Sequence, residues 1–147
     1  MSPTDVRNRM EKSQIFIFTS DWNEGWGAVL NEAMNSGCAV VVSHSIGAAP
    51  YLIRHGENGY LYSSGNIEEL SSLVKSLISN PLKAEDMGTN AYKTITDTWN
   101  ASVAVTRFYE LCSSILSGNR GVAYSDGPLS IDRGKVKNSG KYQHKKH

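Results

Sequence analysis

Two short apolar runs constrain the fold of this chain more than any other feature. They are Ile15-Phe16-Ile17-Phe18-Thr19 and Cys38-Ala39-Val40-Val41-Val42, both rich in β-branched or aromatic side chains. Continuous rather than alternating apolarity is typical of strands that are covered on both faces, as in a parallel sheet. A parallel pair needs a crossover connection, and we expect a helix between the two runs.

Turn and capping signals predict the other elements. The expected order is a helix at 4–13 capped by Thr4, a strand at 15–19, a helix at 26–36 ended by Gly37, a strand at 38–42, one or two helical turns at 50–55, a strand at 60–62, and helices at 66–78, 81–99 and 100–116. Asn66 and Glu69 have the spacing of a capping box, and Asn100 is in position to cap the last helix.

This order predicts an α/β fold with a Rossmann-like parallel sheet and flanking helices. Three strands are few, because a doubly wound nucleotide-binding sheet has about six, built from two halves. If the chain corresponds to the second half, its first strand lacks its inner neighbour. That strand then leaves an apolar edge open to pairing with a partner or a second copy.

Composition indicates one globular domain followed by a polar tail. The chain has 147 residues, of which 39% are hydrophobic and 20% charged. Residues 1–117 hold 8 Lys/Arg against 12 Asp/Glu, whereas residues 118–147 hold 7 against 2. We expect a folded domain at 1–118 and a disordered basic tail at 119–147. The acidic balance of the folded part gives no support to nucleic-acid binding.

Cysteine use and hydropathy bear on location. Cys38 and Cys112 lie in apolar contexts without metal-ligand spacing, so we expect buried thiols in a reducing, cytoplasmic compartment. No run of 18 apolar residues is present, and we expect no membrane-spanning segment.

The candidate site lies in the loop that follows the first strand. In open α/β sheets, ligands bind beyond the carboxyl ends of the strands, where this loop begins. Gly25 and Gly27 allow a close approach to the backbone, and the helix start offers free N–H groups to phosphate or hydroxyl oxygens. Glu24 and Glu32, eight positions apart, add carboxylates that accept hydrogen bonds from paired hydroxyls.

Structural interpretations of the same acids stay open. Glu32 falls off the centre of the apolar arc of its helix, as a solvated residue does. Glu24 and Asp21 also fit ordinary loop acids that favour a helix start.

Other polar and aromatic candidates have weaker contexts. His44 fits a capping or exposed role better than a catalytic one, and His55 fits a turn. Ser43 and Ser45 lack a nucleophile-elbow context. Trp22 and Trp26 are candidates for stacking on a sugar or base, whereas Trp99 fits a core position.

A family resemblance strengthens the functional interpretation of the loop. The matching residues are Glu24-Gly25-Trp26-Gly27, Glu32-Ala33-Met34-Asn35-Ser36-Gly37-Cys38-Ala39-Val40-Val41, Gly47-Ala48-Ala49-Pro50 and Gly56-Glu57-Asn58-Gly59-Tyr60-Leu61. In this order they resemble the C-terminal domain of retaining glycosyltransferases with two facing Rossmann domains (GT-B fold, family 4, glycosyl transferases group 1). The likeness covers about residues 15–116.

The resemblance implies roles for five residues. Glu24 would be the catalytic-site carboxylate that accepts hydrogen bonds from the hydroxyls of the donor sugar. The backbone N–H groups of Gly25, Trp26 and Gly27 would contact the sugar or diphosphate, and Glu32 would accept from the ribose hydroxyls. The implied donor is a nucleoside-diphosphate sugar. No metal or other cofactor is expected.

This chain departs from the family pattern at positions that affect how the donor loop is supported, and it lacks parts that activity requires. Tyr51 stands where the family often has Glu, and Ala39 stands where it commonly has Pro. The basic pair that grips the diphosphate and the acceptor-binding N-terminal domain have no counterpart in this chain. We therefore expect little or no transferase activity from the chain alone. Many such relatives use lipid-linked acceptors, so the basic tail (Arg133, Lys135, Lys137, Lys141, Lys145, Lys146) is also a candidate for weak peripheral contact with anionic lipid.

Three hypotheses follow. The first is the donor half of a retaining hexosyl transferase that works with a missing half. The second is a remnant that binds a nucleotide sugar or docks on a partner without chemistry. The third is a generic Rossmann-like ligand-binding domain.

Overall fold

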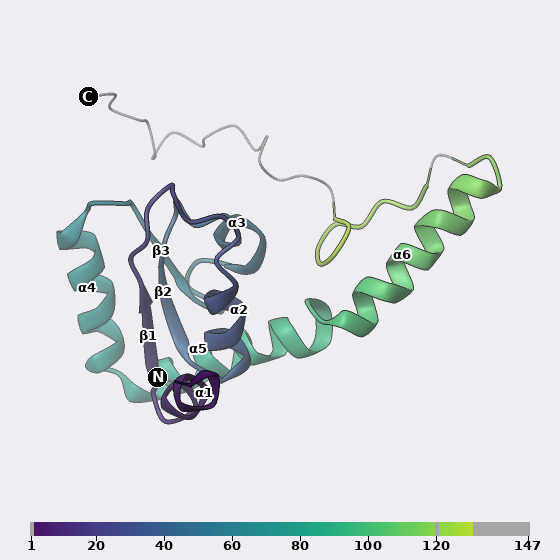
Figure 1. Ribbon diagram of the computed structural model, residues 1–147. Helices are drawn as coiled ribbons and strands as arrows, with labels where there is room; N and C mark the ends of the chain where they lie inside the picture. Colours follow the sequence, from purple (N-terminus) through teal and green to yellow (C-terminus); the bar gives the residue numbers. More distant parts are fainter. Residues whose placement is uncertain (1, 120, 131–147) are drawn as a thin grey trace.

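The computed structural model describes residues 2–119 and 121–130 and has an α/β fold (Figure 1). The elements are α1 (Pro3–Glu11), β1 (Ile15–Phe18), α2 (Ala28–Asn35), β2 (Ala39–Ser43), α3 (Ala49–Leu52), β3 (Tyr60–Tyr62), α4 (Ile67–Ile78), α5 (Pro81–Lys93), a π-helical turn η1 (Thr94–Thr98) and α6 (Ala101–Leu116). The strands form one parallel sheet in the order β1-β2-β3. The predicted fold class and all three predicted strands are confirmed, with shifts of one residue at strand ends.

Side chains of β2 form the centre of the core. All five residues of this strand are buried, because it lies between two strands and two layers of helix. Val40 and Val42 pack into a cluster that contains Leu30 of α2, whereas Val41 packs into a cluster that contains Leu77 of α4. Figure 1 shows α2 and α4 on opposite faces of the sheet. This alternation explains the continuous apolar run, because both faces of the strand are covered.

The first strand lies at an edge of the sheet, as predicted. β1 pairs only with β2 among the described residues, through the register Phe16↔Val40. Ile17 keeps 44% of its side-chain surface exposed. The edge is therefore apolar and has unpaired backbone groups on its outer side.

Capping places α1 and α2 at slightly different starts from those predicted. Ser2, not Thr4, is the N-cap of α1, because the Ser2 hydroxyl accepts from the Asp5 backbone N–H at 3.2 Å and the Asp5 carboxylate accepts from the Ser2 backbone N–H at 3.0 Å. The hydrogen bonds from Ser2 lower the pKa of Asp5 from its ordinary value. Gly37 ends α2 with a φ of +77°, as predicted.

The predicted helix at 81–99 changes pitch near its end. α5 stops at Lys93, and the π-helical turn follows, with the Trp99 N–H bonded to the Thr94 carbonyl at 3.0 Å. Thr94 is buried, and its hydroxyl oxygen accepts from the Asn58 side-chain amide at 2.9 Å while donating to the Asn90 carbonyl at 2.8 Å. π-Helical turns are rare and occur mostly as single turns at the interruption of an α-helix.

Asn58 is the polar centre of this side of the core, which the sequence indicated only as part of a turn. It is fully buried. Its side-chain oxygen accepts from the Arg54 backbone N–H at 2.7 Å, and its amide donates to the Leu52 carbonyl at 2.9 Å as well as to Thr94. Asn58 therefore ties the turn before β3 to the end of α5.

Helix α6 forms within the predicted bounds and has Asn100 as its N-cap, whose side chain accepts from the Val103 N–H at 3.0 Å. Its apolar face is not in the core, because none of its residues is buried and Phe108 is 60% exposed. Figure 1 shows the helix extending away from the sheet.

Part of the predicted basic tail lies against α6. The Arg107 guanidinium donates to the backbone carbonyls of Asp126 and Pro128, the latter at 3.0 Å, and lies 4.3 Å from the centre of the Tyr124 ring. Arg54 also pairs with the Asp126 carboxylate at 3.6 Å. Residues 120 and 131–147, for which the sequence predicts disorder, lie outside the described residues.

The two thiols differ in environment. Cys38 is buried and lies 3.3 Å from the carbonyls of both Met10 and Ser13, whereas Cys112 on α6 is only half-buried, which corrects the expectation for that residue. Neither forms a disulfide. None of the helices within the described residues is long and apolar enough to cross a membrane.

We predict that Asn58→Ala lowers the free energy of unfolding by about 2–3 kcal/mol, because it leaves a buried N–H and a buried carbonyl without partners. Urea denaturation measures this change. The control is Asn90→Ala, which removes one exposed side-chain bond to the Glu57 carbonyl, and we expect a cost of about 0.5 kcal/mol. Equal losses for both variants would contradict the role assigned to Asn58.

We predict that Cys38 reacts with a thiol reagent far more slowly than Cys112 in the folded protein. Burial raises the pKa of the Cys38 thiol, so less thiolate is present at a given pH, and the sulfur is also inaccessible. Labelling at pH 8 followed by peptide mass spectrometry measures the two rates. Equal labelling under native conditions would be inconsistent with the buried position of Cys38.

Candidate functional site

The loops that follow β1 and β2 meet at the carboxyl end of the sheet. We call residues 21–27 the glycine loop. The Gly47 N–H donates to the Gly25 carbonyl at 3.0 Å, and the Ala48 N–H donates to the Trp26 carbonyl at 2.9 Å. The Ser45 hydroxyl adds a third link by donating to the Ser20 carbonyl at 3.1 Å. The two loops therefore form one hydrogen-bonded unit.

Glycine is required at the end of the glycine loop. Gly27 is the N-cap of α2 and has a φ of +79°, a conformation that side chains disfavour. A Cβ atom there would lie 2.7 Å from the Ile46 side chain and 3.0 Å from the Phe18 ring. Gly27 thus turns the chain from β1 into α2 over a packed surface, and for this reason α2 begins at Ala28 rather than at Trp26 as predicted.

The hydrogen bonds between the loops use carbonyl groups and leave N–H groups available. Within the described residues, the backbone N–H groups of Gly25, Trp26 and Gly27 have no hydrogen-bond partner. Gly25 and Trp26 are exposed, whereas Gly27 is buried. These groups precede α2, where unpaired N–H groups and the helix dipole favour an anion or an electron-rich oxygen.

Two carboxylates of the glycine loop, those of Glu24 and Asp21, have different surroundings. Glu24 is half-buried, and its carboxylate accepts one bond, at 3.4 Å, from the Ser20 hydroxyl. The Asp21 carboxylate already has partners within the loop, because it accepts from the backbone and side-chain N–H groups of Asn23 at 2.9 and 3.1 Å. Glu24 therefore keeps most of its accepting capacity, whereas Asp21 shapes the loop.

Glu32 is exposed on α2 and lines a groove of about 510 Å³ between α1 and α2. The other lining residues are Pro3, Thr4, Val6, Arg7, Met10, Asn35 and Ser36. Glu24 does not line this groove, so the structure places the two acids on one loop–helix unit but not in one cavity. No sequence signal predicted that α1 contributes to this groove.

The histidines have structural contacts. His44 Nδ1 lies 2.9 Å from the Ser64 backbone nitrogen and 3.2 Å from the Tyr62 carbonyl oxygen. The His55 ring accepts from the Leu61 N–H at 3.1 Å. Ser43 is buried with its hydroxyl 2.6 Å from that of Ser45. These contacts agree with the structural roles that the sequence favoured.

Aromatic rings surround the glycine loop. Trp22 is 60% exposed and meets the His44 ring edge-on at 5.2 Å. Trp26 lies 5.7 Å from Tyr51 and 5.9 Å from Trp99, centre to centre. Trp99 also packs on the core, as predicted.

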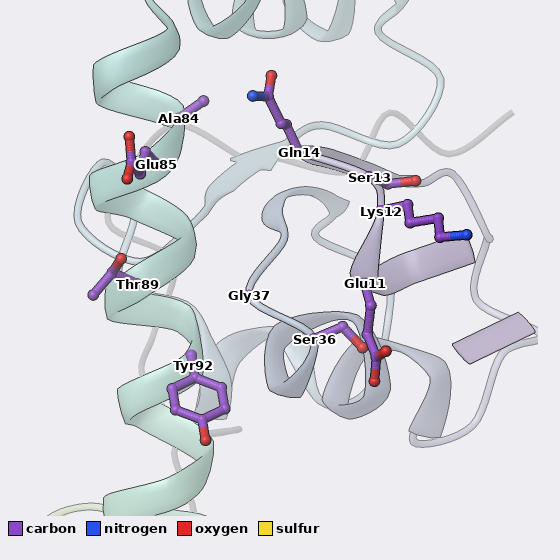
Figure 2. A pocket seen from close by; sticks show the side chains of 10 residues that line it. All are labelled: Glu11, Lys12, Ser13, Gln14, Ser36, Gly37, Ala84, Glu85, Thr89 and Tyr92. Atoms are coloured by element: carbon purple, nitrogen blue, oxygen red, sulfur yellow. The ribbon is translucent and has the colours of Figure 1, made fainter. Parts of the chain in front are cut away.

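A separate cavity of about 350 Å³ lies at the opposite end of the sheet (Figure 2). Its walls include Glu11 and Gln14 before β1, Gly37 after α2, and Glu85 and Tyr92 of α5. Because parallel sheets bind ligands beyond their carboxyl ends, this cavity is not the candidate site. No group of three or more metal-binding side chains occurs in the part of the chain that the structure describes.

Solved structures share this fold. The C-terminal domain of the glycosyl transferase group 1 family protein LpcC from Francisella tularensis is 28% identical, with a TM-score of 0.60 over 65% of this chain and 48% of that chain. Anabaena Alr3699/HepE in complex with UDP is 28% identical, with a TM-score of 0.67 over 75% of this chain and 30% of that chain. The fold is thus similar to the C-terminal domains of GT-B glycosyltransferases.

Sequence comparison assigns the family. The family model for Glycosyl transferases group 1 matches residues 1–94, and the chain belongs to this family. Spore coat protein SA of Bacillus subtilis (strain 168) is 29% identical over 89 residues, which are 60% of this chain and 23% of that protein. The chain therefore spans about a quarter of this curated relative.

We predict that Gly47→Ala destabilises the protein by about 1–3 kcal/mol, because a Cβ atom would lie 2.3 Å from the Gly25 carbonyl oxygen and force the two loops apart. The matched control is Gly25→Ala, where a Cβ atom meets nothing within 4 Å. Thermal denaturation of both variants measures the difference. Equal stability of the two variants would contradict the close contact between the loops.

Proposed function

We propose that this chain supplies part of the donor-binding half of a retaining glycosyltransferase of family 4, which moves a hexosyl group from a nucleoside-diphosphate sugar to an acceptor. The observation that carries the proposal is the set of N–H groups at Gly25, Trp26 and Gly27, which make no hydrogen bond within the described residues. In the sequence these residues lie between Glu24 and Glu32, at the start of α2. Alr3699/HepE was solved with UDP and with UDP-glucose, which supports a nucleotide-sugar ligand.

In this proposal the helix start binds the diphosphate or the sugar oxygens. Backbone N–H groups donate to these oxygens, and the positive end of the α2 dipole offsets their charge. Glu32 accepts from the two ribose hydroxyls, since a carboxylate has two oxygens for a pair of donors.

Glu24 is the catalytic-site residue of the proposal. Its carboxylate accepts from the hydroxyls of the donor sugar and orients the ring while the bond between the sugar and the diphosphate breaks. The leaving diphosphate gains negative charge, which the N–H groups and positive side chains stabilise. The basic pair that the family uses to grip the diphosphate has no counterpart in this chain. The proposal involves no metal and no other cofactor.

A non-catalytic role is the second candidate. β1 leaves an apolar edge with Ile17 exposed. This edge favours a chain that docks on a partner, such as an N-terminal half or a second copy, and holds a nucleotide sugar without performing transfer alone. Reading the DNA upstream of Met1 discriminates the two, because an adjoining half with a basic pair favours the enzyme.

We propose a cytoplasmic location, since two free cysteines suit a reducing compartment. The basic residues that would contact anionic lipid, from Arg133 to Lys146, lie outside the described residues. Peripheral membrane contact therefore stays a prediction.

The two carboxylates are expected to respond differently to two ligands. Glu32→Gln should weaken UDP and UDP-glucose binding alike, by about 1–3 kcal/mol, because it changes a contact with the nucleoside. Glu24→Gln should weaken UDP-glucose binding by a similar amount and leave UDP binding unchanged, because it changes a contact with the sugar. Isothermal titration calorimetry on the full chain measures all four affinities.

Glu68→Gln is the control, since Glu68 is exposed in the first turn of α4. It should bind both ligands as the wild type does. Wild-type affinity in Glu32→Gln would remove this residue from the site, and absence of UDP binding by the wild type would contradict the proposed function.

A further inference from the structure

Three aromatic side chains from distant parts of the chain pack together beside the glycine loop. The ring of Trp26 lies 5.7 Å from that of Tyr51 and 5.9 Å from that of Trp99, and the rings of Tyr51 and Trp99 are 6.4 Å apart. We call these residues the aromatic cluster. The three distances are within the range of favourable aromatic pairs, and the rings of Tyr51 and Trp99 have the edge-on orientation that such pairs prefer.

Each member belongs to a different segment. Trp26 is in the glycine loop, Tyr51 is in α3, and Trp99 ends η1 immediately before α6. α3 follows directly on Gly47 and Ala48, the residues that donate to the glycine loop. The aromatic cluster therefore spans both sides of the contact between the two loops.

The Trp26 side chain is held even though it is 43% exposed. Its indole Nε1 donates to the Asn31 side-chain oxygen at 2.9 Å, which fixes the ring relative to α2. A half-exposed tryptophan would otherwise sample several rotamers. The bond to Asn31 and the two ring contacts restrict this ring.

Trp99 supplies an independent observation. Its Nε1 atom is buried and has no hydrogen-bond partner within the described residues. Burying a donor without an acceptor is unfavourable, so the position of this ring depends on its packing. The packing partners include Trp26, Tyr51 and the core cluster of α2.

We propose that Trp26, Tyr51 and Trp99 are positioning residues that hold the glycine loop against Gly47 and Ala48, and so keep the loop N–H groups aimed at the ligand. The identity of the ligand, a nucleoside diphosphate, rests on the proposed function, whereas the positioning of the loop does not. Tyr51 is the decisive member, because its ring contacts both Trp26 and Trp99 and it lies on α3, directly after Gly47 and Ala48.

Amide hydrogen exchange tests the positioning without any ligand. In Tyr51→Leu, the Gly47 and Ala48 amides should exchange about tenfold faster than in the wild type, because their acceptors are carbonyls of the glycine loop. The Val41 amide in the central strand should keep its wild-type rate, which shows that the fold is intact. UDP titration of the same full-length variant should give a Kd about three- to tenfold higher than the wild type.

Three further variants complete the test. Tyr51→Phe keeps the ring and should restore both readouts, whereas a role of the hydroxyl alone would leave this variant impaired. Tyr109→Leu removes an exposed tyrosine of α6, 74% exposed, and should change neither readout. If Tyr51→Leu does not fold, Trp26→Leu removes two of the same ring pairs at a half-exposed position.

The outcomes separate this proposal from the proposed function. Wild-type exchange at Gly47 and Ala48 in Tyr51→Leu overturns the positioning role. Faster exchange with unchanged UDP affinity overturns the link between the cluster and the ligand. If the wild type itself binds no UDP, the proposed function and that link both fail, while the exchange rates still decide whether the cluster positions the loop.

Discussion

The site depends on two backbone hydrogen bonds between loops, from Gly47 and Ala48 to the carbonyls of Gly25 and Trp26. They form only because β1 and β2 are parallel neighbours, so that their carboxyl ends lie at the same edge of the sheet. Because these bonds use carbonyls, the N–H groups of Gly25, Trp26 and Gly27 have no partner within the described residues. One arrangement thus anchors the loop and keeps its donors available.

The buried polar contacts of Asn58 also support this arrangement. Asn58 joins the turn before β3 to Thr94 at the start of the π-helical turn. That turn ends at Trp99, whose ring packs on Trp26. The core, the change of helical pitch and the glycine loop are therefore connected through side-chain packing, although the residues are far apart in the chain.

Much of the fold could be predicted because its signals are local. Continuous apolar runs indicated buried strands, and Gly37 and Asn100 marked helix ends where the structure has them. Local signals failed where competing residues were close, as with Ser2 and Thr4 at the start of α1. They also failed for α6, whose helical periodicity was correct but whose apolar face packs on no core. Periodicity states which residues share a face, not what covers that face.

The sequence by itself determined the parallel α/β fold, the glycine loop at a helix start and the family motif that includes Glu24 and Glu32, because these depend on residue type and spacing over a few positions. Only the tertiary structure decided that Glu32 faces a groove shared with α1, and that Tyr51 and Trp99 pack on Trp26. The physical reason is that these contacts join segments up to 73 positions apart. Their geometry is set by how the helices pack on the sheet, which no local pattern encodes.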